Sequence, residues 1–215
     1  MTYAVKEAYY TLQGEGAQTG RAAVFLRFAG CNLWSGLERD RASAVCSFCD
    51  TDFVGVDGEN GGKFQTADGV AAHVRRIWDE GAVRISTPYI VCTGGEPLLQ
   101  LDVALITALN AAGFEIGVET NGTIAAPSGL DWICVSPKAD AALQQVSGSE
   151  LKLVYPQDAL EAQPEQFETL DFTHFFLQPK DDVNAAANTQ AAAEYCMKNP
   201  QWRLSLQTHK LIGLP

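Results

Sequence analysis

Three of the six cysteines in this 215-residue chain lie in one short segment, CNLWSGLERDRASAVCSFC, at positions 31, 46 and 49. Closely spaced thiols are typical metal ligands. A structural zinc site needs four closed ligands, and the three histidines, at 73, 174 and 209, are isolated in the sequence and are interpreted as ordinary surface or core residues. Iron–sulfur clusters are held by cysteine thiolates. Three thiolates therefore favour a four-iron cluster with one iron left open for a substrate or cofactor.

The other three cysteines, Cys92, Cys134 and Cys196, lie within apolar strand-like or helix-like segments. Free cysteine in such a setting behaves as a small buried hydrophobic residue. We therefore expect only Cys31, Cys46 and Cys49 to act as ligands.

The elements that would position these thiols alternate between strands and helices. Short apolar runs bounded by Gly, Pro or Asn predict strands at 22–29, 88–93, 114–119, 132–136, 150–155, 174–178 and 203–207. Helical spacing of apolar residues predicts helices at 66–81, 101–113 and 184–200. This alternation indicates an α/β fold with a mostly parallel sheet, in one domain spanning residues 1–215. The polar segment 55–63 is predicted to be a flexible loop.

Polar and glycine-rich segments follow the predicted strands. They are the cysteine segment, TGGEP (93–97), ETNG (119–122), SPK (136–138) and LQPK (177–180). Functional residues of parallel α/β sheets gather at the carboxyl ends of the strands. We therefore expect these segments to meet around one site.

Taken together, these motifs resemble one known family. Three cysteines after the first predicted strand, with Phe48 before the third, and GGEP after the second resemble the radical S-adenosylmethionine (SAM) superfamily, although its usual spacing is C-x3-C-x2-C rather than the C-x14-C-x2-C found here. TLQGEG (11–16), CDTD (49–52), ETNG and SPK further resemble the 7-carboxy-7-deazaguanine synthase family, and this likeness runs from Thr11 to the end of the chain.

The resemblance implies a partial (β/α) barrel with reduced helix content. It also implies an enzyme that converts 6-carboxy-5,6,7,8-tetrahydropterin to 7-carboxy-7-deazaguanine with loss of ammonia, for deazapurine (queuosine) biosynthesis. In such an enzyme a 5′-deoxyadenosyl radical takes hydrogen from C6, and SAM is regenerated. The implied cofactors are a [4Fe–4S] cluster, SAM and Mg2+, and the implied partners are a flavodoxin or ferredoxin and a second copy in a homodimer.

Site residues follow from matching motifs. The cluster ligands would be Cys31, Cys46 and Cys49, and the Mg2+ ligand Thr51. SAM would contact Phe48, Gly94, Gly95, Glu96, Asn121, Ser136, Lys138 and Gln178. The pterin would contact Leu12, Gln13, Gly14, Glu15, Arg27, Thr93, Gly94 and Pro215.

Several of these residues have structural alternatives. The segment at Thr51 could instead begin a helix, capped by Asp50 or Asp52. Arg27 lies in an apolar strand and needs a partner, which could be the substrate carboxylate or an ion pair with Glu7 or Glu15. The apolar tail that ends at Pro215 could fold over the site, or could serve packing or dimer contact.

Composition excludes some classes of function. The net charge is −11 and the pI about 4.6, and no basic stripe of the kind that binds nucleic acid or a membrane surface is present. No signal-like or spanning apolar run occurs, so a cytoplasmic location is expected. Arg39 and Arg41, in the insert between the first two cysteines, are interpreted as solvated charges, with a partner contact as the alternative.

Two other functions remain open at this stage. A glycyl-radical activase would carry C-x3-C-x2-C and would lack TLQGEG. A zinc-binding structural module would use the same thiols but would not need SAM.

Overall fold

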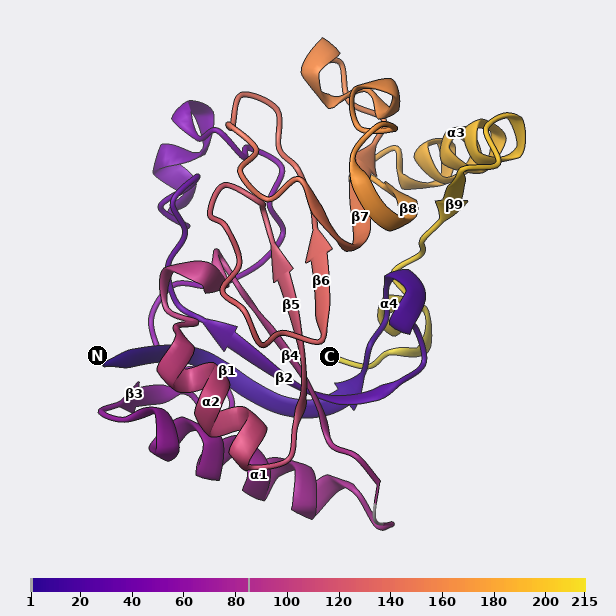
Figure 1. The fold of residues 1–215 in the computed structure, drawn as a ribbon. Coiled ribbons are helices and arrows are strands. Elements are labelled where there is room, and N and C mark those ends of the chain that lie inside the picture. Colours follow the sequence, from indigo (N-terminus) through magenta and orange to yellow (C-terminus); the bar gives the residue numbers. More distant parts are fainter. Residues whose placement is uncertain (1, 85) are drawn as a thin grey trace.

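A mostly parallel sheet organises the molecule (Figure 1). The structure is a computed structural model, and it describes residues 2–84 and 86–215. Within these ranges nine strands form one sheet in the order β3-β1-β2-β4-β5-β6-β7-β8-β9. Their bounds are β1 Tyr3–Leu12, β2 Ala22–Phe28, β3 Gly62–Phe64, β4 Tyr89–Gly94, β5 Glu115–Thr120, β6 Trp132–Val135, β7 Ser147–Tyr155, β8 Asp171–Pro179 and β9 Trp202–Leu204.

From β2 to β9, neighbouring strands pair in parallel, whereas β1 is antiparallel to both β2 and β3. The sheet curves but remains open, with β3 and β9 at its two edges. Parallel strands bring their carboxyl ends to one side, and the segment after β2, which carries the cysteines, lies at the same end as the arrowheads of β5 and β6 (Figure 1).

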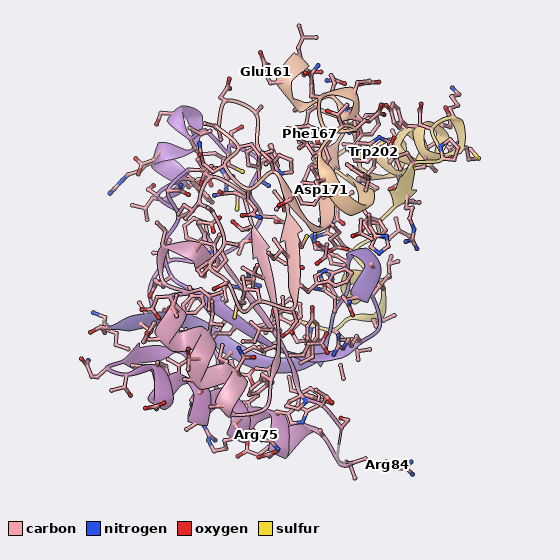
Figure 2. The ribbon with its side chains drawn as sticks, in the orientation of Figure 1. Arg75, Arg84, Glu161, Phe167, Asp171 and Trp202 are labelled. Atoms are coloured by element: carbon pink, nitrogen blue, oxygen red, sulfur yellow. The ribbon has the colours of Figure 1, made fainter. Side chains whose placement is uncertain are left out.

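Four α-helices are found in the described part of the chain: α1 Ala67–Gly81, α2 Val103–Ala111, α3 Ala185–Lys198 and α4 Thr208–Ile212. The apolar faces of α1 and α2 pack with β1, β2, β4 and β5 in one core cluster. Side chains of α3 form a second cluster with β7, β8 and β9, which includes Phe167 and Trp202 (Figure 2). The connections from β5 to β6 and from β6 to β7 hold no helix in the described residues.

The predicted mostly parallel α/β fold with reduced helix content is therefore confirmed. All seven predicted strands and all three predicted helices are present, with ends that shift by up to three residues. Thr66 is the expected N-cap of α1, where its hydroxyl oxygen accepts a hydrogen bond from Gly69 N at 3.1 Å. The helix predicted at 101–113 begins later, because the Asp102 side chain caps it by accepting from Leu105 N at 2.9 Å.

Among the described residues, two strands, β1 and β3, and one α-helix, α4, were not predicted from the sequence. Lys6 and Glu7 interrupt the apolar pattern of β1, and the β1–β2 register shifts between Val5 and Glu7. Lys6 is nevertheless buried, because it forms ion pairs with Asp52 and Asp57. The prediction of a loop over 55–63 was wrong at its end, where Gly62 and Lys63 pair with β1 as part of β3.

Helices long and apolar enough to cross a membrane were searched for in the described residues, and none was found.

Candidate active site

A cavity of about 450 Å³ opens at the carboxyl end of the sheet. All but one of the residues that the sequence assigned to cluster, SAM, Mg2+ or pterin line it: Leu12, Gln13, Gly14, Glu15, Arg27, Cys31, Cys46, Phe48, Cys49, Thr51, Thr93, Gly94, Gly95, Asn121, Ser136, Lys138, Gln178 and Pro215. They come from the ends of six strands and from the C-terminus. Segments far apart in the sequence therefore share one space.

The three thiols lie on one wall of this cavity, and all three are free. Interaction between the Cys46 and Cys49 thiols raises the pKa of Cys46 and lowers the pKa of Cys49. Cys31 Sγ accepts from Leu33 N at 3.4 Å, and burial raises the pKa of its thiol. No three His, Cys, Asp or Glu side chains of the described chain gather closely enough to hold a single ion.

The two glycines of GGEP permit the cysteine segment to approach β4. Gly94 has φ +147°, and a Cβ there would collide with the backbone of Phe28. A Cβ on Gly95 would overlap Gly30 O and lie 2.6 Å from Cys31 Cβ. The glycines thus bring TGGEP directly against the first cysteine.

Glu96 is the one predicted site residue that does not line the cavity. It is fully buried, and its carboxylate accepts hydrogen bonds from Leu98 N, Thr120 Oγ1 and Asn121 N at 2.8–3.0 Å. Burial raises the pKa of Glu96, although these three donors oppose the change. The structure therefore gives Glu96 the task of joining the ends of β4 and β5.

Four other residues assigned to SAM are held by hydrogen bonds to their neighbours. Lys138 Nζ donates to Ser136 O and Ser136 Oγ, both at 2.7 Å, and desolvation lowers the pKa of Lys138. Asn121 Nδ2 donates to Asn32 Oδ1 at 3.0 Å. Gln178 Oε1 accepts from Ser205 Oγ at 2.8 Å.

A buried lysine that the sequence analysis did not select lines the cavity beside Glu15. Lys152, on β7, donates to Glu15 and lies 3.5 Å from Glu119 Oε1. Burial opposes ionisation of Glu15, but the charge and hydrogen bond of Lys152 outweigh it and lower the pKa of Glu15 to about 2. Gln207 Nε2 donates to the second Glu15 oxygen at 2.9 Å, and Gln13 Nε2 donates to Glu119 at 2.8 Å.

Lys152 could have been selected as a candidate site residue from the sequence. It is a charged residue in the apolar strand ELKLVY, and the same signal selected Arg27.

The C-terminal segment closes one side of the cavity. Thr208 N and Oγ1 both donate to Gly14 O at 2.9 Å, and Thr11 Oγ1 donates to Pro215 O at 3.3 Å. His209 packs so closely on Gly14 that a Cβ at that glycine would overlap its ring. His209, which the sequence analysis interpreted as an ordinary surface or core histidine, therefore lines the cavity.

Arg27 forms an ion pair with Glu7, which the sequence analysis gave as one structural alternative to substrate binding. Its Nε donates to Glu7 Oε1 at 2.8 Å and its Nη2 to Tyr9 Oη at 3.3 Å, while the side chain also lines the cavity. Burial disfavours the charge, but Tyr9 and Glu7 raise the pKa of Arg27. The guanidinium is thus held at the cavity wall.

Thr51 also lines the cavity, between two anchored aspartates. Asp52 pairs with Lys6 at 2.9 Å, and Asp50 pairs with Lys210 of the C-terminal helix at 3.0 Å. The alternative that a helix begins at Thr51 is wrong, because the described chain has no helix there and Asp52 Oδ1 only closes a turn with Val54 N.

Comparison with known proteins gives a consistent result, although no protein-family model matches the chain. The 7-carboxy-7-deazaguanine synthase of Caulobacter vibrioides is 65% identical over the full length of both chains, and that of Bordetella pertussis is 60% identical, also over both full lengths. The crystal structure of QueE from Escherichia coli superposes with a TM-score of 0.65 at 27% identity, covering 96% of this chain and 94% of that one.

The structural match agrees with the predicted partial α/β barrel. The full-length identity decides the family. The chain therefore belongs to the 7-carboxy-7-deazaguanine synthase family of enzymes.

Proposed function

We propose that the protein converts 6-carboxy-5,6,7,8-tetrahydropterin to 7-carboxy-7-deazaguanine with loss of ammonia, within deazapurine (queuosine) biosynthesis. The proposed cofactors are a [4Fe–4S] cluster, SAM that is regenerated, and Mg2+. One observation carries the proposal: three free thiols and a set of charged groups suited to a carboxylated pterin line one cavity.

The thiol wall suits a cluster better than zinc. Structural zinc takes four ligands at about 2.3 Å from one ion, and the described chain offers no such gathering of side chains. A cluster takes one thiolate on each of three irons, so its ligands need not converge on one point. When bound, the cluster and SAM together supply the radical that removes hydrogen from the substrate.

The remaining cavity residues would bind and orient SAM and substrate. Lys138 and Ser136 offer a cation and a hydroxyl on the thiol side, suited to the methionyl carboxylate. Glu15 and Glu119 are acceptors for the N–H groups of a pterin edge. Arg27 offers a cation for the pterin carboxylate.

The decisive experiment is an anaerobic assay of reconstituted protein with SAM, dithionite, Mg2+ and 6-carboxytetrahydropterin. We expect brown protein whose visible absorbance bleaches with dithionite, and formation of the deazaguanine product. A colourless protein that contains zinc and does not consume SAM would contradict the proposal. Brown protein that cleaves SAM but leaves the pterin unchanged would contradict the substrate alone.

Replacing Thr51 with Ala should weaken the response to Mg2+. The Thr51 hydroxyl is a hard oxygen ligand at the cavity wall, and Mg2+ in such sites uses few protein ligands besides substrate and water. We expect the Mg2+ concentration for half-maximal rate to rise by about tenfold, the equivalent of about 1.4 kcal/mol. The measurement is product rate against Mg2+ concentration, with Thr107→Ala on the exposed face of α2 as control. An unchanged Mg2+ curve would remove Thr51 from the metal site.

Replacing Arg27 with Lys should raise the KM for the pterin by about tenfold and leave the affinity for SAM unchanged. Lysine keeps the charge but loses the planar fork that can serve Glu7 and a carboxylate together. The control is Arg75→Lys, which alters a more exposed ion pair, with Asp79 on α1, outside the cavity (Figure 2). Equal losses of SAM and pterin binding would show that Arg27 serves the fold rather than the substrate.

We also propose a flavodoxin or ferredoxin as electron donor, a homodimer and a cytoplasmic location. Family membership supports these expectations.

A further inference from the structure

The long insert between Cys31 and Cys46 closes on itself near its two ends. Val45 N donates to Leu33 O at 3.1 Å, so the chain that enters the insert lies beside the chain that leaves it. The residues between them form a loop with a short 3-10 helix at Glu38–Ser43. Cys31 and Cys46 therefore lie at the base of this loop, as neighbours across it.

One side chain of the insert reaches back to the turn that carries the other two cysteines. Arg41 Nη1 donates to Ser47 O at 2.9 Å and to Cys49 O at 3.0 Å. Its Nε donates to Glu38 at 2.8 Å, and its guanidinium lies 4.3 Å from the centroid of the Trp34 ring. Hydrogen bonds from a charged donor and contact with an aromatic face both stabilise such an arrangement.

The Trp34 ring extends this arrangement to the chain beyond the third cysteine. It packs edge to face on Phe53, with ring centroids 5.6 Å apart, and Phe53 is buried. Arg41, Trp34 and Phe53 thus hold the CSFC turn from within the insert and from the segment that follows Thr51.

Arg41 is therefore not the solvated charge that the sequence suggested. Arg39, two residues earlier, fits that description, because its side chain is 79% exposed and contacts only Asp40 at 3.7 Å among the acidic groups described. The two arginines form a matched pair within one short helix.

We propose that Arg41 is a positioning residue for the iron–sulfur cluster. By holding the carbonyls of Ser47 and Cys49, it fixes the turn that presents Cys46 and Cys49 and keeps both thiolates in register with Cys31. The contacts of the insert would then fix the relative positions of the three cysteines. In the usual C-x3-C-x2-C spacing, the short connection between the cysteines does this by itself. This inference rests on the proposed cluster site, and it assigns the insert a structural task distinct from partner binding.

The test compares wild type, Arg41→Met and Arg39→Gln after anaerobic reconstitution. We expect full iron and sulfide content in wild type and in R39Q, with equal rates of cluster loss to an iron chelator. R41M should lose its cluster about ten- to a hundredfold faster, since two charge-assisted hydrogen bonds and a ring contact are removed. Its cluster should also have a more negative reduction potential and a changed electron paramagnetic resonance signal with SAM, because a nearby cation is lost.

The outcomes separate the two claims. A wild type that holds no cluster contradicts the proposed function. A fully loaded wild type together with an R41M cluster of the same lifetime and potential contradicts the role of Arg41 alone. Melting of the cluster-free proteins reports whether R41M folds. If it does not, Arg41→Lys replaces it, with cluster loss expected to be about threefold faster than in wild type, and equal lifetimes again overturn the proposal.

Discussion

Replacing Cys46 with Ala is expected to lower product formation by about a thousandfold or more, because a radical route has no substitute once its metal centre is lost. Cys46 is buried at the cavity wall, and its thiol interacts with that of Cys49. Without it only two thiols remain in the cysteine segment, which leaves two irons without a protein ligand. The measurements are iron and sulfide content, visible absorbance and product rate under anaerobic conditions.

Cys196 provides the matched control for this variant. It is a free, partly buried cysteine on α3, away from the cavity lining. Cys196→Ala should keep the full cluster complement and the full rate. A Cys46→Ala protein with a normal cluster and normal turnover would remove Cys46 from the ligand set, and the same loss in both variants would indicate general damage to the fold.

Much of this site could be predicted because parallel strands deliver their carboxyl ends to one place. The cysteine segment, TGGEP and SPK were each recognised as motifs after a strand and were expected to meet, and in the structure they line one cavity. The need for glycine at positions 94 and 95 could also be anticipated, because glycine permits another backbone to approach closely. The structure adds that the approached group is the chain from Phe28 to Cys31.

The direction of a side chain was harder to predict than its position. Glu96 follows two cavity glycines, but its carboxylate points into the protein toward Thr120 and Asn121. Two of its three donors, Thr120 Oγ1 and Asn121 N, come from the end of β5 and the residue after it, and no local pattern around Glu96 reveals them. His209 gave no signal either, because its place in the cavity depends on the return of the C-terminus to Gly14.

Lys152 is expected to be the most sensitive residue on the side of the cavity where we propose that the pterin binds. It is buried between Glu15 and Glu119, and the two carboxylates are otherwise held by Gln207 and Gln13. Removing one member of a buried ion pair leaves the other charge without compensation, which costs about 3–5 kcal/mol. The Glu15 side chain is only 14% exposed, so solvent cannot replace the lost cation.

Lys152→Met should therefore lower both stability and activity, with kcat/KM for the pterin reduced by about a hundredfold or more because the acceptor pair loses its fixed geometry. In the wild type the pKa of Glu15 is lowered to about 2 from 4.5. Its contribution to stability is thus present above pH 4.5 and is lost as the pH falls toward 2. The stability difference between wild type and variant should narrow over the same range, as measured by denaturant unfolding.

A second substitution distinguishes a role at the substrate from a role in the fold. The double variant Glu15→Gln/Lys152→Met removes the more buried of the two carboxylates that lose their cation and should regain most of the lost stability. It should not regain pterin turnover, because the acceptor is gone as well. SAM binding to the cluster should be unchanged in both variants, and Lys198→Met on the exposed side of α3 should match wild type throughout. If the double variant recovers turnover along with stability, Lys152 and Glu15 serve only the fold, and the pterin edge must be bound by other groups.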